Sequence, residues 1–258
     1  MNILVVGRGW VGVKVFSELV IRGHTVALAP HSHYVEPSKN CDWVINCAGL
    51  TGVPNVDACE KEKKKTIEAN AYFPVRLYEQ TQSPLTRFAH FSSGCIYKGE
   101  ITDVNAEPNY FGSIYSTSKA MSDSYLSDKA IVFRIRMPFT EIEENKNLLS
   151  KLTKYSKTGR IVEGGPNSIT DLDEAIQVAC DIIEKDLEIG PYNLVNKGTV
   201  TTKQIIDLLG LTPEWYTPEE FKLATAADRS NCTIPAYHKM RDVMEALNHR
   251  VNTFRGLE

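Results

Sequence analysis

Four side chains that can do chemistry lie close together in the middle of the chain: Ser93, Cys95, Tyr115 and Lys119. Tyr115 and Lys119 are four residues apart, so on a helix they lie on one face, one turn from each other. Because a nearby ammonium favours the phenolate, we expect Lys119 to lower the pKa of Tyr115 from about 10 towards neutrality. Such a tyrosine can give a proton to a carbonyl oxygen or take one from an alcohol. Tyr-x-x-x-Lys also arises by chance on amphipathic helices, so the pair needs support from the rest of the chain.

The sequence around these residues predicts the elements that position them. Residues 87–92 are predicted to form a strand around the apolar run of residues 88–91, and Ser93 follows at its C-terminal end. Residues 110–126 are predicted to form the helix that carries Tyr115 and Lys119. A hydroxyl at the end of the strand could therefore hold the same carbonyl oxygen as the phenol on the helix.

A glycine loop lies at the start of the chain. Residues 2–6 are a short β-branched run, which is the pattern of a central parallel strand, and they are followed by G-R-G-W-V-G and an amphipathic helix. In this fingerprint Gly7 permits the tight turn, Gly9 lets the backbone approach a pyrophosphate, and Gly12 lets the helix pack on the strand. The N-terminus of the helix offers N–H groups and a positive dipole end to the phosphates. The loop therefore predicts a dinucleotide site.

The end of the second predicted strand, residues 24–29, bears on which dinucleotide binds. NAD sites commonly place an acidic residue there to bind the ribose 2′-hydroxyl, whereas this chain continues with A-P-H-S-H and has no carboxylate until Glu36. Arg8, inside the glycine loop, could pair with a 2′-phosphate. We therefore predict NADP(H) in preference to NAD(H); the alternative is that Arg8 is a solvated loop charge.

The alternation of strands and helices predicts an α/β fold, a Rossmann-like doubly wound parallel sheet. The third strand, residues 43–47, ends in N-C-A-G, whose small residues let a nucleotide lie against the backbone at the C-terminal edge of the sheet. Only about a dozen residues precede it after the second strand, so the crossover helix there must be short or absent.

Beyond Pro138 the pattern loosens. This predicts an NADP-binding domain over residues 1–138 and a smaller substrate-binding part over residues 139–258, with residues 171–196 packing back on the main sheet. Residues 212–233 are polar and carry no predicted element. The other predicted elements are strands over residues 131–135, 160–162 and 192–195 and helices over residues 147–156, 171–185 (capped by Thr170), 201–209 and 239–248.

Composition excludes several classes of protein. The 258 residues are 42% hydrophobic and 24% charged with a net charge of −3, so no basic surface indicates nucleic acid or an anionic membrane as partner. No apolar run approaches the ~20 residues needed to span a bilayer. The chain starts on a strand, so we expect no signal peptide. Six cysteines without paired spacing predict free thiols in a reducing cytoplasm, and no His or Cys cluster indicates a metal site.

Together the glycine loop, N-C-A-G, Ser93 and Tyr115-x-x-x-Lys119 resemble the extended short-chain dehydrogenase/reductases over nearly the whole chain. Longer stretches resemble, more narrowly, the bifunctional nucleotide-rhamnose synthases (epimerase/reductases) of plants and some large viruses. These stretches are N-C-A-G-L-T-G-V-P-N-V-D-A-C-E, S-G-C-I-Y, P-N-Y-F-G-S-I-Y-S-T-S-K-A-M, R-I-R-M-P and P-N-S-I-T-D-L-D-E. The short loop after the second strand departs from the family.

The resemblance implies a function and a set of site residues. Enzymes of this family epimerise C3 and C5 of a UDP- or dTDP-4-keto-6-deoxyglucose and then reduce C4 with NADPH, and the family suggests a homodimer. The implied reductase residues are Ser93, Tyr115 and Lys119, and the implied epimerase residues are Cys95 and Lys151. The implied substrate contacts are Thr51, Asn55, Ser93, Arg136 and Asn167. The predicted cofactor contacts are Gly7, Arg8, Gly9, Trp10, Val11, Gly12, Cys47, Ala48, Gly49, Asn70, Tyr115, Lys119 and Met137.

Two other functions fit the same sequence. One is a plain NADPH-dependent 4-ketosugar reductase, of the dTDP-4-dehydrorhamnose reductase or GDP-fucose synthase type, in which Cys95 is a small buried hydrophobe and Lys151 an exposed helix lysine. The other is a non-catalytic NADP-binding regulatory module. Such a module needs the glycine loop but not the tyrosine–lysine pair, and the presence of both favours an enzyme.

Overall fold

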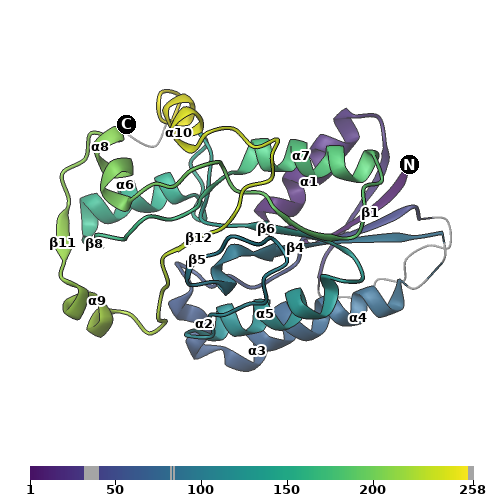
Figure 1. Cartoon of the computed structure of the whole chain (residues 1–258), viewed down its shortest axis with the longest axis horizontal. Helices are drawn as coiled ribbons and strands as arrows, with labels where there is room; N and C mark the ends of the chain where they lie inside the picture. The colour runs from purple at the N-terminus through teal and green to yellow at the C-terminus, as the bar shows by residue number, and fades with distance from the viewer. Residues whose placement is uncertain (32–40, 82, 84, 255–258) are drawn as a thin grey trace.

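The computed structural model describes residues 1–31, 41–81, 83 and 85–254, and a six-stranded sheet lies at its centre (Figure 1). Every neighbouring pair of strands in this sheet is parallel. The predicted doubly wound α/β fold is therefore confirmed. In sheet order the strands are β10 (Gly190–Asn193), β6 (Ile131–Ile135), β4 (Arg87–Ser93), β3 (Trp43–Asn46), β1 (Asn2–Val6) and β2 (Thr25–Ala29).

Helices cover both faces of the sheet. Figure 1 shows α1 (Trp10–Ile21) and α7 (Leu172–Glu184) on one face, with the helices between β3 and β6 on the other. Since side chains alternate along a strand, Val5 packs under α1 and α7 while Val6 packs under the second helical layer. That layer comprises α2 (Asp57–Lys61), α3 (Lys63–Ile67), the π-helix η1 (Glu68–Tyr72), α4 (Phe73–Gln80) and α5 (Ile114–Leu126).

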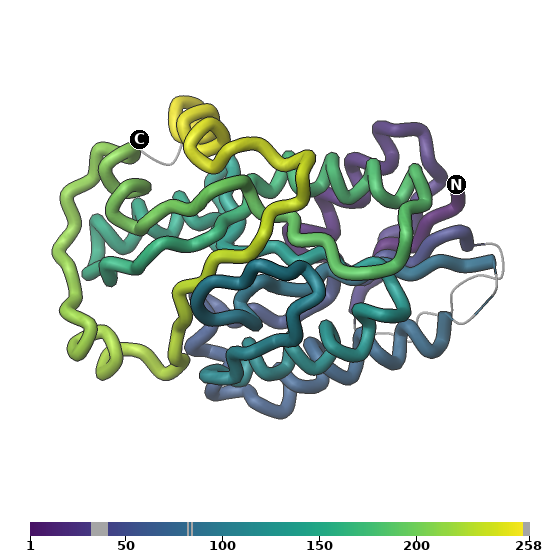
Figure 2. The backbone as a smooth tube through the Cα atoms, in the orientation of Figure 1, coloured from purple at the N-terminus to yellow at the C-terminus, as the bar shows by residue number. Residues whose placement is uncertain are grey.

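The C-terminal part has a hydrophobic core of its own, built around Phe139, Leu149 and Ile205. Figure 2 shows it at one end of the molecule, with the chain after α9 running back across the part that contains the six-stranded sheet. Three short parallel strand pairs accompany this core. They are β11 (Glu214–Tyr216) with β8 (Arg160–Val162), β7 (Pro138–Phe139) with β9 (Thr170–Asp171), and β12 (Cys232–Thr233) with β5 (Gly99–Glu100). The last pair connects the C-terminal part to the segment after β4. Its helices are α6 (Leu148–Thr158), α8 (Thr202–Leu208), α9 (Pro218–Ala224) and α10 (Val243–Val251).

Several predicted boundaries are wrong, mostly because caps decide where helices begin. Helix α5 begins after Ser113, whose hydroxyl accepts from the Ser116 amide, so Tyr110 lies outside it. The cap of α7 is Asp171 rather than Thr170, because the Thr170 hydroxyl is engaged by the Leu194 carbonyl and the Arg136 amide. Residues 212–233, predicted to be irregular, contain β11, α9 and β12. The predicted short or missing crossover helix and Glu36 fall between β2 and β3, where residues 32–40 lie outside the described residues.

A buried ion pair joins α5 to the sheet. Asp123 of α5 is fully buried and accepts hydrogen bonds from Nη2 of Arg134 on β6 at 2.6 Å and from Ser92 Oγ on β4 at 2.5 Å. Arg134 is only 2% exposed and also donates to the Val104 carbonyl. No helix among the described residues is long and apolar enough to cross a membrane.

Removing one member of this pair should destabilise the fold strongly, because the other charge stays buried without its partner. We expect Asp123→Asn to lower the free energy of unfolding by about 3–5 kcal/mol. Lys203→Gln is the control, since it breaks the exposed Lys203–Asp207 pair, and such a pair contributes about 0–1 kcal/mol. Urea unfolding of both variants measures the difference, and equal losses would contradict a stabilising role for the buried pair.

Candidate active site

The structure brings Ser93, Tyr115 and Lys119 together at the C-terminal end of β4. Ser93 is the last residue of β4, and its hydroxyl accepts a hydrogen bond from the Cys95 amide at 3.1 Å and lies near the Tyr115 phenol. Lys119 Nζ donates to the Phe91 carbonyl at 3.1 Å. All three side chains are buried. The spacing of Tyr115 and Lys119 on one helix is as predicted.

The pKa of Tyr115 is raised, which contradicts the lowering that the sequence suggested. Burial disfavours the phenolate and is the largest cause, and the nearby Cys95 adds to it, while the Ser93 hydroxyl acts the other way. Burial also lowers the pKa of Lys119 to about 8, against the attraction of Asp123. The sequence showed the spacing but not the desolvation. A phenol with a raised pKa stays protonated at neutral pH and can serve as a proton donor.

The glycine loop has the shape that a dinucleotide phosphate requires. Gly7 has φ +110°, and a Cβ on Gly12 would lie 1.8 Å from the Gly7 carbonyl oxygen, so the loop is closely packed there. Above Gly9, by contrast, a Cβ would meet nothing within 4 Å. Gly9 caps α1 without a side-chain hydrogen bond, and the first turn holds no acidic residue. The first-turn amides can therefore bind an anion.

The end of β3 continues this surface. Gly49 is exposed, and a Cβ there would lie 3.1 Å from both Asn70 Oδ1 and Lys119 Nζ. The Asn70 amide is buried and bonded to the backbone of Leu50, so Asn70 holds the loop after β3 in place. Ala48 is buried, while Trp10, Val11 and Cys47 are partly buried and pack against the core under α1.

Arg8 and Met137 lie at two edges of this surface. The exposed Arg8 side chain donates to the Leu28 carbonyl at 3.3 Å, near the end of β2. Met137 follows β6 with φ +43°, a left-handed conformation that is uncommon for a residue with a side chain. Its side chain packs against the core of the C-terminal part.

Cys95 and Lys151 come from different parts of the chain, and the two side chains interact electrostatically. Cys95 lies in the 3₁₀ turn η2 (Gly94–Ile96) directly after β4, and Lys151 lies on α6; both are partly buried. Burial is the largest cause of a lowered pKa at Lys151, the charges of Lys146 and Arg229 add to it, and Cys95 opposes it. The cations acting on Lys151 are thus Lys146 and Arg229. Among the described residues the Lys151 ammonium has no hydrogen-bond partner.

Arg136 and Asn167 are buried and hydrogen-bonded to each other, next to the residue that precedes Cys95. Arg136 Nη2 donates to Asn167 Oδ1 at 2.6 Å and to the Ser230 carbonyl at 2.7 Å, and Nη1 donates to the Gly94 carbonyl. Its Nε has no partner within the described part of the chain. Thr51 and Asn55 lie instead in the loop after β3, partly buried.

Residues that sequence reasoning did not select also lie near the site. Tyr155 follows Lys151 by one turn of α6 and accepts a hydrogen bond from Asn55. Asp57 and Arg229 form an ion pair next to the same loop. The four-residue spacing from Lys151 was a signal for Tyr155, whereas nothing in the sequence connects Asp57 with Arg229. No group of three or more His, Cys, Asp or Glu in the described ranges is placed to hold a metal ion.

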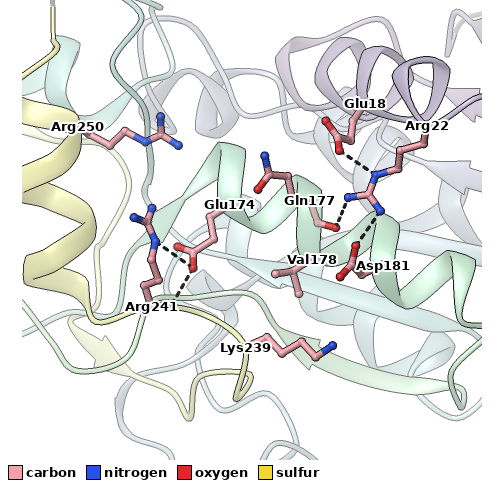
Figure 3. A pocket seen from close by; sticks show the side chains of 9 residues that line it. All are labelled: Glu18, Arg22, Glu174, Gln177, Val178, Asp181, Lys239, Arg241 and Arg250. Carbon is pink, nitrogen blue, oxygen red and sulfur yellow. Dashed lines mark hydrogen bonds and ion pairs between the residues drawn. The ribbon is translucent and has the colours of Figure 1, made fainter.

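A hollow of about 690 Å³ lies elsewhere, between α1, α7 and the segment that leads into α10 (Figure 3). Its arginines are paired with carboxylates: Arg22 with Glu18 and Asp181, and Arg241 with Glu174. None of its lining residues belongs to the predicted site. The hollow is therefore separate from the chemistry of Ser93 and Tyr115.

A parallel nucleotide-binding sheet, a glycine loop at its first turn and a Ser-Tyr-Lys set beside β4 define an oxidoreductase of the short-chain dehydrogenase/reductase type. The family model described as RmlD substrate binding domain matches residues 1–242. The chain belongs to this family, and it is an enzyme of the extended short-chain dehydrogenase/reductase type.

Curated relatives come from rhamnose synthesis. A trifunctional UDP-glucose 4,6-dehydratase/UDP-4-keto-6-deoxy-D-glucose 3,5-epimerase/UDP-4-keto-L-rhamnose-reductase of Arabidopsis thaliana is 32% identical over 225 residues, 80% of this chain and 33% of that protein. The chain thus spans about a third of the trifunctional relatives that it matches. A bifunctional dTDP-4-dehydrorhamnose 3,5-epimerase/dTDP-4-dehydrorhamnose reductase of the same plant is 29% identical, over 91% of this chain and 85% of that protein.

Solved structures agree with the fold. The L780 UDP-rhamnose synthase of Acanthamoeba polyphaga mimivirus superposes with a TM-score of 0.88 at 26% identity, covering 98% of this chain and 99% of that chain. A dTDP-4-dehydrorhamnose reductase of Bacillus anthracis in complex with NADP has a TM-score of 0.78 at 17% identity, covering 98% of both chains. At that identity the likeness shows the fold alone.

Proposed function

We propose that this chain is a nucleotide-sugar 3,5-epimerase/4-reductase, which converts a UDP- or dTDP-4-keto-6-deoxyglucose to the L-rhamnose form with NADPH. The observation that carries the proposal is that Cys95, which lies next to Ser93 and near Tyr115, also interacts electrostatically with Lys151. A reductase needs only the last two with Lys119. The two additional groups supply an acid and a base, and the bifunctional plant relative, matched over most of its length, combines the same two activities.

Epimerisation follows from the acidity of the protons next to the 4-ketone. Lys151, whose pKa is lowered, can remove a proton from C3 or C5, and the Cys95 thiol can return one from the opposite face. Ser93 and Tyr115 would hold the enolate oxygen by hydrogen bonds. Because proton removal and return come from different elements, η2 and α6, the carbon can invert.

Reduction uses the same oxygen contacts. NADPH, when bound along the glycine loop and the end of β3, supplies the hydride for C4. Tyr115 gives its proton to the 4-oxygen, and its raised pKa keeps that proton available. Lys119, next to Gly49 and hydrogen-bonded to Phe91, contributes a positive charge near both phenol and cofactor site while it is protonated.

Two features support NADPH over NADH. The Arg8 side chain reaches the end of β2, and no carboxylate follows Ala29 in residues 30 and 31. A third feature supports a cytoplasmic location. All six cysteines are free thiols, which fits a reducing compartment. We also assign the cofactor to residues 1–138 and the substrate chiefly to residues 139–258.

If Arg8 pairs with the 2′-phosphate, Arg8→Ala should weaken NADPH by about tenfold and leave NADH nearly unchanged, because only NADPH carries that phosphate. Isothermal titration with each cofactor measures both constants. Arg76→Ala is the control, since Arg76 pairs with Glu68 on an exposed surface. If Arg8→Ala weakened the binding of NADPH and NADH equally, the proposed contact of Arg8 with the 2′-phosphate would be contradicted.

The reductase should lose activity at alkaline pH through Lys119 rather than Tyr115. Lys119 has a lowered pKa of about 8, so its charge is present below that pH and is lost as the pH rises through it. Tyr115 has a raised pKa and stays protonated over the same range. We expect kcat/KM for NADPH oxidation with a pre-epimerised 4-ketosugar to be level below about pH 8 and to fall above it.

Tyr115→Phe tests the other half of this assignment. It should lower the reduction rate by about two to four orders of magnitude at all pH values while the protein still binds NADPH. A wild-type profile that is flat through pH 10 would show that the charge of Lys119 is not required.

The epimerase is tested without its reductase. Cys95→Ser and Lys151→Ala should each reduce deuterium uptake at C3 and C5 of the 4-ketosugar in D₂O, without NADPH, by about two orders of magnitude or more. Reduction of a pre-epimerised ketosugar should be largely retained. Mass spectrometry measures the uptake, and Lys154→Ala on the exposed face of α6 is the control. Uptake at the wild-type rate in both variants would leave a plain 4-ketosugar reductase.

A further inference from the structure

The loop after β3 is hydrogen-bonded to the C-terminal part at two contact points. Asn55 Nδ2 donates to Tyr155 Oη on α6 at 3.3 Å. Asp57, the first residue of α2, accepts from the Ala227 amide at 2.9 Å and from Arg229 Nη2 at 2.8 Å. We name these five residues the clasp, and its hydrogen-bonded partners are 100 to 172 positions apart along the chain.

A hydrogen bond connects the two contact points. Asn55 Oδ1 accepts a hydrogen bond from the Asp57 amide at 2.9 Å, so one side chain connects both anchor points. Gly52 has φ +72°, and a Cβ there would lie 2.2 Å from the Asn55 carbonyl oxygen, so the turn before Asn55 is tight. The loop therefore holds α6 and residues 227–229 at fixed positions relative to each other.

Lys151 is close to both contact points. Tyr155 follows it by one turn on the same face of α6, and the charge of Arg229 acts directly on its ammonium. Lys146, in the segment before α6, is the second cation that acts on Lys151, and Cys95 in η2 is the group that opposes them. Two residues of the clasp are therefore close to Lys151: Tyr155 on the same helix, and Arg229 in the segment of residues 227–229.

We propose that the clasp positions Lys151 opposite Cys95, with Asp57 and Arg229 as positioning residues for proton exchange at the sugar. The proposal rests on the epimerase function proposed above. Reduction does not depend on the clasp, because Ser93, Tyr115 and Lys119 lie on β4 and α5, which Asp123 holds together.

Asp57→Asn and Arg229→Gln test the proposal. The side chains of this pair are 24% and 31% exposed, so either charge can be removed without burying the other. Deuterium uptake at C3 and C5 of UDP- and dTDP-4-keto-6-deoxyglucose, without NADPH, should fall by about tenfold to a hundredfold, the usual effect of a small misplacement. NADPH oxidation with the pre-epimerised ketosugar should stay within about twofold of wild type. Glu220→Gln, which alters the Arg160–Glu220 pair inside the C-terminal part, is the control.

The pH profile of exchange separates positioning from general loosening. Removing the Arg229 charge raises the pKa of Lys151, and since a base must be neutral, Arg229→Gln should move the rise of the exchange profile to higher pH. Wild-type exchange in Asp57→Asn, or a parallel loss of exchange and reduction, would overturn the proposal. If the wild-type protein itself exchanges no deuterium, the epimerase function fails and the clasp loses its catalytic role with it.

Discussion

The site depends on how α5 is held against the sheet, and the buried pair of Asp123 and Arg134 does this. Asp123 lies one turn beyond Lys119 and two turns beyond Tyr115, so the three side chains follow one stripe of the helix. By bonding Ser92 as well, Asp123 fixes that stripe relative to β4, where Ser93 is the next residue. The approach of Ser93 to Tyr115 and the hydrogen bond of Lys119 with Phe91 then follow from this one anchoring.

Burial acts on the groups of this site in opposite directions. It raises the pKa of Tyr115, because the phenol is neutral when protonated, and it lowers the pKa of Lys119 and Lys151, because an amine is neutral when deprotonated. One cause thus keeps a proton on the phenol and makes an amine more available as a base. No direct contact between the phenol and an amine is needed for these shifts, because desolvation by the surrounding protein is the main cause of each pKa shift.

Features that arise from neighbouring residues could be predicted from the sequence, and those that need distant partners could not. The strand of residues 131–135 and the glycine loop follow from local patterns, and both have the predicted positions. In contrast, β11 and β12 exist because they pair with β8 and β5, so residues 212–233 show no local strand signal. The same limit explains Asp57 and Arg229, and it explains why the pKa of Tyr115 was expected to move the wrong way: spacing is visible in the sequence, burial is not.

The arrangement also shows why two reactions place different demands on one fold. Hydride reduction needs groups from β4 and α5, which one buried ion pair holds together inside the nucleotide-binding part. The proposed inversion needs a second group on the far side of the sugar, and we assign this role to Lys151 on α6, in a part with a separate core. Its precision therefore depends on contacts between the parts. Such contacts are partly exposed, as at Asp57 and Arg229, and are weaker than the buried pair. The proposed epimerase geometry is accordingly the more easily lost of the two, and a chain that lost it would keep the groups that we assign to a 4-ketosugar reductase.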